Sequence, residues 1–374
     1  MATEERRVFD ATARAVSGEF VDIGGEHFYA IRNVDRMQAF FVSLISDSDH
    51  WLFASSNGAL TAGRVSPETA LFPYVTVDKI HDSVTNTGST TLVRQRVGGS
   101  LNTWEPFAAT PDDRFEISRS IYKSVLGNKL CFEETNRTLQ ISFRYTWLTS
   151  ESYGFVRHCE LTNLGASHVE LDLIDGLQNI LPAGTPRFAQ TNTSNLVDAY
   201  KWTELDEQTG LAFFTLYSGI TDRAEPCESL RANTVFSLGL PEPTLLLSAQ
   251  QLGDFRGGMT PQPENRVRGT RGAYLAAATL RVEPRSTTTW QLVADIEKDQ
   301  ADVLKLRNEL RDGQALLTAI QQDIERGSDA LARIMASGDA FQMTAEDTVS
   351  AHHYANVMFN VLRGGIFDEH YSVC

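Results

Sequence analysis

The stretch Leu139-Gln140-Ile141-Ser142-Phe143-Arg144-Tyr145-Thr146-Trp147 decides the fold class of this chain. Its odd-numbered residues are all apolar or aromatic, and polar residues separate them. Successive side chains of an extended strand point to opposite faces, so the apolar residues of this stretch share one face. This alternation predicts a β-strand that buries one face and exposes the other.

Similar short runs recur on both sides of this stretch. Two of them, 155–163 and 168–174, flank a loop with Gly165 and are typical of a β-hairpin. Many strands with few helical stretches between them predict a mainly β fold, a large antiparallel β-sandwich over residues 1–295. The other predicted strands are 27–31, 39–45, 50–54, 90–97, 211–217, 234–238, 244–248, 274–280 and 287–293.

The pattern becomes helical near residue 296. Apolar residues then recur every seven positions, which predicts one or two helices that pack on the sandwich and form a linker over 296–340. A free coiled coil is the alternative, which Gly313 and Gly327 disfavour. Residues 341–374 are expected to begin a following helical domain, an α/α barrel, and to stop short of completing it. The seven-residue stripe consists of Val303, Leu310, Leu317 and Ile324, with Leu306 and Ile320 in the second seam position.

Composition restricts the partners. The chain has 374 residues and a formal net charge of −15, with 33 basic against 48 acidic residues. This balance argues against nucleic acid and membrane as partners, because both need clustered positive charge. The N-terminus lacks the apolar segment of a secretory signal, and four scattered cysteines without a CxxC pattern fit a reducing compartment. We therefore expect a cytoplasmic protein.

Motifs for catalysis are weak. His352-His353 would point about 100° apart on a helix, so we predict no metal site there. His158 and Glu160 share a strand face and could act as acid and base on a sugar, although a cross-strand contact is the simpler interpretation. The stretch 268–272, with two arginines, could hold an anion or form a surface loop. The sequence has no Walker loop, GxSxG elbow or HExxH motif, and we predict no catalytic residue and no cofactor.

The densest polar and aromatic stretch is 55–80, which we interpret as a long loop over 57–78. Long loops on a rigid sandwich often carry ligand contacts, and sugar sites combine stacking aromatic rings with planar polar groups. The alternative is a loop that packs on its own sheet or at a subunit interface. The predicted substrate-binding residues are Asn57, Arg64, Tyr74, Asp78 and Lys79, with Trp104 as a further aromatic platform.

Four features together resemble the N-terminal region of inverting glycoside phosphorylases of the cellobiose phosphorylase type (glycoside hydrolase family 94). One is a strand followed by a polar and aromatic loop, from Trp51 to Tyr74. The second is the predicted Asn163-Leu164-Gly165 hairpin leading to Leu171-Asp172-Leu173-Ile174-Asp175-Gly176-Leu177-Gln178-Asn179-Ile180-Leu181-Pro182. The third is the helical linker. The fourth is the stretch His353-Tyr354-Ala355-Asn356-Val357-Met358-Phe359-Asn360-Val361-Leu362-Arg363-Gly364-Gly365-Ile366-Phe367.

The resemblance implies a galactose-mutarotase-like sandwich whose helices lead to a catalytic barrel. In that family the barrel supplies the catalytic Asp and much of the phosphate site, so no catalytic residue is carried over to this chain. The implied role is to support the site of a β-glucoside phosphorylase or related glycosyl transferase, with inorganic phosphate as co-substrate of the parent enzyme. The implied partners are a β-linked oligosaccharide, the missing C-terminal barrel and a second copy of the chain in a homodimer. Two alternatives stay open: a non-catalytic carbohydrate-binding or structural module, and a mutarotase-like epimerase that uses a His and a Glu.

Overall fold

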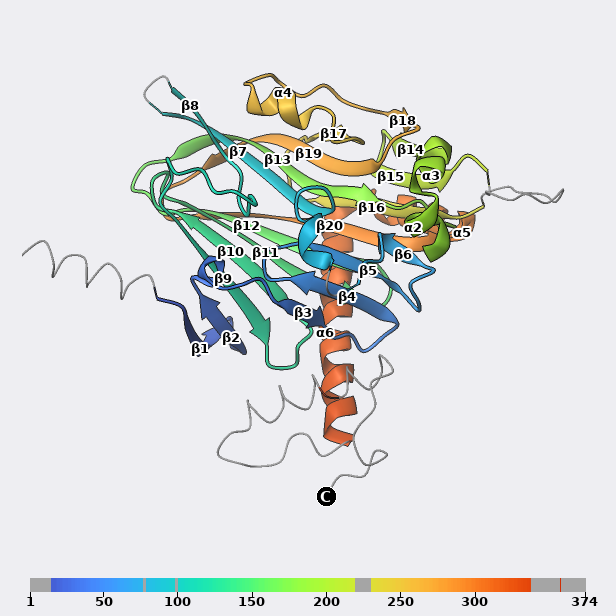
Figure 1. Ribbon diagram of the computed structural model, residues 1–374, viewed down its shortest axis with the longest axis horizontal. Helices are drawn as coiled ribbons and strands as arrows, with labels where there is room; N and C mark the ends of the chain where they lie inside the picture. Colours follow the sequence, from blue (N-terminus) through green and yellow to red (C-terminus); the bar gives the residue numbers. More distant parts are fainter. Residues whose placement is uncertain (1–14, 77–78, 98–99, 219–229, 338–356, 358–374) are drawn as a thin grey trace, which may run out of the picture.

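The computed structural model describes residues 15–76, 79–97, 100–218, 230–337 and 357 (Figure 1). Over these residues the predicted fold class is confirmed: the chain is mainly β, its sheets are antiparallel, and helices follow the last strand. The alternating stretch of the sequence becomes strand β11 (Ile141–Ser150), in which Ile141, Phe143, Tyr145 and Trp147 are all buried.

The largest layer is a sheet of eleven described strands. Its central strands pair in long, regular registers, for example Trp147 opposite Arg157 and Cys159 opposite Trp290. In spatial order its strands are β1 (Ser17–Ile23), β2 (Glu26–Arg32), β9 (Ile117–Ser124), β10 (Leu130–Asn136), β11, β12 (Gly154–Asn163), β20 (Thr287–Lys298), β16 (Ala232–Leu238), β15 (Leu211–Leu216), β14 (Lys201–Asp206) and β18 (Arg266–Arg268).

A second sheet of five described strands packs against the first and makes the structure a sandwich (Figure 1). The core between the two sheets is rich in large side chains, with Phe143 and Trp290 from the eleven-stranded sheet and Leu173 and Tyr274 from the five-stranded sheet. Burying this apolar surface is the main driving force for the layered arrangement. The strands of the second sheet, in order, are β17 (Thr244–Leu246), β19 (Gly272–Val282), β13 (Val169–Ile180), β7 (Gly88–Val97) and β8 (Ser100–Trp104).

The predicted hairpin over 155–174 is wrong. Strands β12 and β13 are consecutive in sequence, but β12 belongs to the eleven-stranded sheet and β13 to the five-stranded sheet. The side-chain amide of Asn163 donates hydrogen bonds to the carbonyl oxygens of Ser167, Val282 and Glu283 at 2.7, 3.1 and 3.2 Å, and so fixes the corner where the chain changes sheet. Alternation identifies a half-buried strand without identifying its partner, which is why the sequence pattern misled.

The interpretation of 57–78 as one long loop is also wrong. This region contains β5 (Leu60–Arg64) and β6 (Ala70–Phe72), which join β3 (Phe41–Leu44) and β4 (His50–Ser55) in a sheet of four described strands. The residues of β5 up to Gly63 and all of β6 are buried, and most of them enter the main core. Strand β5 was hard to recognise because its sequence, Leu-Thr-Ala-Gly-Arg, is short and has no β-branched apolar or aromatic residue.

Two helices follow the sandwich in the described part of the chain, in line with the prediction of one or two. Asp299 caps α5 (Gln300–Glu309) by accepting hydrogen bonds from the backbone N–H groups of Ala301 and Asp302. Helix α6 (Gly313–Ser337) then packs its Leu316, Ile320 and Ile324 on the outer face of the eleven-stranded sheet. The other short helices among the described residues are η1 (Val34–Arg36), η2 (Ile80–Ser83), α2 (Arg187–Asn192), α3 (Ser194–Tyr200) and α4 (Leu252–Arg256).

The expected following domain, residues 341–374 with His352-His353, lies outside the described residues apart from Val357. None of the helices that the structure describes combines the length and the apolar character needed to cross a bilayer.

Candidate functional site

A polar cavity of about 300 Å³, here called the first cavity, opens beside β7, β11 and β13. Its volume lies at the lower end of the range typical of small-molecule sites. Hydroxyl and amide side chains dominate its lining and surround two aromatic rings, Phe107 and Tyr145. The uncharged polar residues at its wall are Asn57, Thr85, Ser89, Thr90, Thr91, Thr110 and Gln178, and its charged lining residues are Glu105 and Arg256.

The two rings of the first cavity are held by packing inside the core. The Phe107 ring meets the Tyr145 ring edge to face, with 5.2 Å between the ring centroids. Burial raises the pKa of Tyr145 above its usual value, so its hydroxyl stays protonated at ordinary pH and can donate a hydrogen bond. The aromatic part of the wall is therefore rigid, and it carries a protonated hydroxyl.

Below the first cavity lies a buried ionic cluster between the two sheets. Arg157 of β12 and Asp175 of β13 are completely buried, and Arg157 Nη1 lies 2.9 and 2.8 Å from the two carboxylate oxygens of Asp175. Trp290 Nε1 donates to Asp175 Oδ2 at 2.7 Å, and Thr91 Oγ1 donates to Asp175 Oδ1 at 2.6 Å. The Arg157 guanidinium also sits 4.4 Å from the centroid of the Tyr145 ring. Because Thr91 and Tyr145 line the cavity, this cluster fixes its floor.

A second buried carboxylate fixes the wall. Glu134 of β10 is 1% exposed and accepts hydrogen bonds from Trp104 Nε1 at 2.7 Å and from the backbone N–H of Phe107 at 2.8 Å. Arg119 Nε lies 2.6 Å from Glu134 Oε2 and neutralises its charge. Phe107 adopts a positive φ of 62°, a backbone conformation that the Glu134 bond helps to hold. Glu134 thus anchors the loop that carries Phe107 into the cavity.

An ion pair from two distant segments also lines the first cavity. Arg256, the last residue of α4, donates from Nη2 to Glu105 Oε1 at 2.7 Å and from Nε to Glu105 Oε2 at 3.0 Å. Their side chains are 44% and 34% exposed, so both still face solvent. The pair presents planar donors and acceptors on the lining of the cavity.

Of the residues predicted from sequence, Asn57 lines the first cavity. Its amide Nδ2 donates to the carbonyl of His81 at 3.2 Å, and its Oδ1 accepts from the backbone N–H of Ala59 at 3.1 Å. Trp104 is a buried core residue, 2% exposed, whose ring supports the wall through Glu134. Its indole borders a neighbouring cavity and not the first one.

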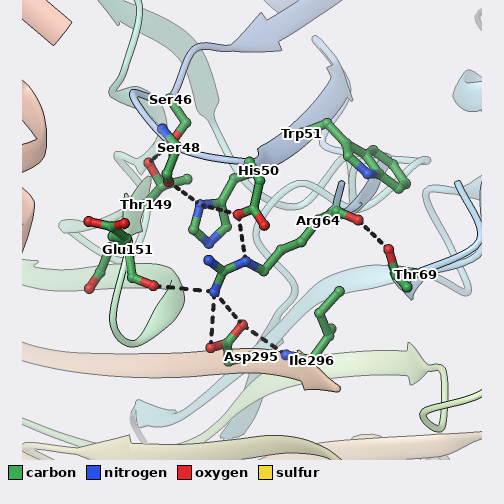
Figure 2. A network of polar contacts seen from close by, with 12 residues as sticks. Ser46, Ser48, His50, Trp51, Arg64, Thr69, Thr149, Glu151, Asp295 and Ile296 are labelled. Atoms are coloured by element: carbon green, nitrogen blue, oxygen red, sulfur yellow. Dashed lines mark hydrogen bonds and ion pairs between the residues drawn. The ribbon is translucent and has the colours of Figure 1, made fainter. Parts of the chain in front are cut away.

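Arg64 stands apart from the first cavity, in the network drawn in Figure 2. Its Nε lies 2.8 Å from Asp49 Oδ1, and its Nη1 lies 3.2 Å from Asp295 Oδ1 and 3.3 Å from the Glu151 carbonyl oxygen. These contacts tie β5 of the four-stranded sheet to the end of β20 in the eleven-stranded sheet (Figure 2). Buried His50 lies in the same network, where burial and then the Arg64 charge lower its pKa to about 4.

The other predicted residues are dispersed. Tyr74 is half-buried, packs edge to face on Trp51 and lies under the Arg187 guanidinium, 5.0 Å from it. Lys79 is exposed at the start of η2, and Asp78 lies outside the described residues. Neither Tyr74 nor Lys79 lines the first cavity. The structure therefore does not bring the predicted set together in this cavity.

His158 and Glu160 do lie together, with 3.5 Å between His158 Nε2 and Glu160 Oε1. They alternate with buried Cys159 on β12 and so face away from the core, beside Arg144, and they do not line the first cavity. A hydrogen bond from His158 lowers the pKa of Glu160, with help from the Arg144 charge. Across the described residues, no group of three or more His, Cys, Asp or Glu side chains is placed to hold a metal ion.

The first arginine of the stretch 268–272 ends β18 and lies over the ring of Trp202, 3.6 Å from its centroid. Its second arginine, Arg271, has its Nε 3.8 Å from Asp198 Oδ2. Both arginines of this predicted anion site therefore already have partners.

Most residues of the first cavity carry no recognisable sequence signal. Thr90 and Thr91 fall within a predicted strand, Gln178 falls within the stretch that carries the family resemblance, and Ser89 and Arg256 are not singled out by any sequence pattern. The wall draws on segments that are far apart in the sequence, so no linear motif marks it.

No family model and no curated protein matches this chain. Among solved structures it is similar to a protein from Escherichia coli K12 assigned as an aldose 1-epimerase, with 12% identity, a TM-score of 0.36 and coverage of 70% of this chain and 99% of that one. It is also similar to a galactose mutarotase-like protein from Clostridium acetobutylicum, with 9% identity, a TM-score of 0.34 and coverage of 76% and 99%.

A third similar structure, from the human microbiome, is assigned as a kojibiose phosphorylase, with 10% identity and a TM-score of 0.32. The match covers 72% of this chain and only 27% of that protein. Identities this low and TM-scores below 0.5 carry no activity over to this chain.

Proposed function

We propose that this chain is a sugar-binding, supporting domain of a carbohydrate-active enzyme, and that the reaction of the parent is phosphorolysis of a β-glucoside or a related glycosyl transfer. The observation that carries the binding role is the first cavity, which combines hydroxyl and amide groups with two aromatic rings. A saccharide has the matching chemistry, since its hydroxyls bond planar polar groups while its C–H faces pack on aromatic rings.

The chemistry of the cavity favours binding over catalysis. Glu105 is the one carboxylate among its described lining residues, and both oxygens of Glu105 accept hydrogen bonds from Arg256. The described lining has no histidine and no second carboxylate, whereas sugar epimerisation or hydrolysis uses an acid and a base that converge on the ligand. In this proposal, parts of the parent enzyme outside the described residues supply the catalytic acid and the binding site for inorganic phosphate.

A non-catalytic carbohydrate-binding module is the second candidate, and the same cavity favours it. The two proposals differ in what completes the site: the supporting domain works together with a catalytic barrel of the same protein, and the module works alone. The epimerase proposal would need His158 and Glu160 to act on a sugar at the outer face of β12, away from the first cavity.

The test is a binding and turnover experiment on the 374-residue chain. Isothermal titration with glucose, mannose, galactose and their β-1,4-linked disaccharides should give saturable binding of at least one sugar. A Gln178→Leu variant, which removes one polar group of the wall, should weaken that binding roughly ten-fold. A matched variant, Gln250→Leu, replaces an exposed glutamine outside the cavity and should bind as the wild type does.

Turnover is measured in the same samples. Phosphate consumption with the disaccharides and mutarotation of the monosaccharides should both stay at the uncatalysed rate. Failure of every sugar in the panel to bind would overturn the binding role, and phosphorolysis or mutarotation by the chain would overturn the supporting role.

A further inference from the structure

A second cavity of about 410 Å³ adjoins the first. It lies between the edge strand β8 and the segment that leads into β9, and Thr103, Asp112, Arg114 and Phe115 are among its lining residues. The two cavities share Glu105, Ala108, Thr110 and Arg256. They are therefore neighbouring halves of one trough, and the Glu105–Arg256 ion pair forms the partition between them.

From this juxtaposition we infer that the trough takes a linear saccharide of at least two sugar units, one in each cavity, with the Glu105–Arg256 pair bonding both. This inference rests on the proposed sugar-binding function and adds the length of the ligand. Each cavity alone lies near the lower end of the volumes of small-molecule sites, a size suited to a single ring.

The second cavity is built to keep its shape. Its lining includes buried Trp104 and Glu134 and the partly buried Arg119, and Trp104 and Arg119 bond the Glu134 carboxylate at 2.7 and 2.6 Å. Glu134 also holds the loop between the two cavities through the backbone N–H of Phe107. One buried carboxylate thus sets the position of both halves of the trough, and such pre-organisation lowers the entropic cost of binding.

The partition can serve a ligand on both sides. Arg256 and Glu105 are partly exposed and lie on the lining of both cavities. A guanidinium has five N–H donors, and the two bonds to Glu105 use only part of them. The pair therefore has capacity left for hydroxyl groups of the sugar rings on either side.

The charges of the second cavity point to a neutral ligand. Each of its three guanidinium groups has a carboxylate partner: Arg114 with Asp112, Arg119 with Glu134 and Arg256 with Glu105. An anion would have to compete with these carboxylates, so the cavity offers no surplus positive charge to a phosphate or sulfate group. A neutral oligosaccharide meets no such competition.

The test compares ligand lengths on the full chain. In isothermal titration the β-1,4-linked disaccharide of the preferred sugar should bind about ten-fold or more tightly than the monosaccharide. Thr103→Leu narrows the second cavity only, and it should bring disaccharide affinity down to the monosaccharide level while monosaccharide affinity stays within about two-fold of wild type. The matched Thr85→Leu variant narrows the first cavity only and should weaken both ligands.

Saturation-transfer NMR on the wild-type chain gives an independent reading that needs no variant. Protons of both sugar rings should receive saturation from the protein. Equal affinity for the two ligand lengths, or saturation confined to one ring, would overturn the two-unit trough and leave single-sugar binding intact. Absence of binding by every sugar would instead remove the proposed function on which this inference rests.

Discussion

Arg157 and Asp175 carry opposite charges at the centre of an apolar core, where both side chains are completely inaccessible to solvent. Desolvating two charges is expensive, and their mutual attraction offsets that cost only while both are present. We expect Asp175→Ala to lower the free energy of unfolding by about 3–5 kcal/mol, because it leaves the Arg157 charge buried and unpaired. Urea unfolding followed by tryptophan fluorescence measures the loss.

The control is Arg281→Ala, which removes the exposed ion pair between Arg281 on β19 and Glu283 just after this strand. Exposed pairs contribute little, so its urea midpoint should stay close to that of the wild type. A double variant, Arg157→Met with Asp175→Leu, should recover part of the stability lost by Asp175→Ala, since it leaves no buried charge. A double variant less stable than Asp175→Ala would argue against this account.

His50 makes the stability of the chain depend on pH. Its folded-state pKa of about 4 lies below the ordinary value of 6.5, so the unfolded chain binds the proton more readily. The contribution of His50 is fully present above pH 6.5 and is lost as the pH falls towards 4. Between pH 7 and pH 5 this amounts to about 2 kcal/mol of unfolding free energy.

Urea titrations at pH 7 and pH 5 check this value. The variant His50→Phe keeps an aromatic ring against Phe155, which His50 meets at 4.9 Å between ring centroids. Because phenylalanine does not titrate, the variant should lose much less stability than the wild type over the same interval. An equal loss in both proteins would assign the pH dependence to other groups.

At the level of single elements, the pairing of β5 with β6 depends on Gly63. A Cβ atom at this position would lie 2.3 Å from the Thr69 carbonyl oxygen and 2.4 Å from the Trp51 ring. We expect Gly63→Ala to cost about 1–3 kcal/mol, because backbone and a packed ring must move. Gly253→Ala in α4 is the matched control: nothing lies within 4 Å of its Cβ position, so thermal unfolding should show no loss.

The local pattern of apolar and polar residues predicted some strands and helices and failed for others. Strand β11 could be predicted because each of its inward residues is large and apolar. Leu306, Ile320 and Ile324 could be assigned to a buried helix face for a similar reason. Strand β9 (Ile117–Ser124) was missed because Ser, Arg and Lys interrupt its apolar residues. Which sheet β13 joins is decided by contacts with β7 and β19, which no local pattern contains.

The candidate site was less predictable than the fold. Asn57 was found because amides in a polar stretch often contact ligands, and it does line the first cavity. Gln178 and Arg256 reach the same cavity from β13 and α4, and their proximity to Asn57 arises only when the sheets pack. Trp104 is predicted as a binding platform from its neighbours in sequence; in the structure its ring lies in the apolar core, donates to Glu134 and borders the second cavity.

At the scale of the whole molecule, α6 connects two parts of the structure (Figure 1). Its first half packs on the eleven-stranded sheet, and its second half places Leu331 and Met335 against Phe53 and Ile80 of the four-stranded sheet region. We expect Leu331→Ala to lower the free energy of unfolding by about 2–5 kcal/mol and to speed amide exchange in β4. Hydrogen-exchange mass spectrometry locates the effect.

Ile334 provides the comparison, because it lies on the same helix with 41% of its surface exposed. Ile334→Ala should change the unfolding free energy by no more than about 0.5 kcal/mol and leave exchange in β4 unchanged. If Leu331→Ala instead speeds exchange evenly over the three described sheets, α6 does not hold the four-stranded sheet in particular.

The contact between Asn128 and Ser328 spans 200 positions of the chain, and β20 fits between β12 and β16 only after most of the intervening residues have been synthesised. Native contacts between residues so remote in sequence form only after long loops have closed. The entropy lost on loop closure precedes the stabilisation that the contacts bring, so folding is slow. During translation, the edge of β12 that pairs with β20 stays unpaired until β20 has emerged from the ribosome. The chain should therefore refold slowly after dilution from urea and gain yield from chaperones that shield open strand edges.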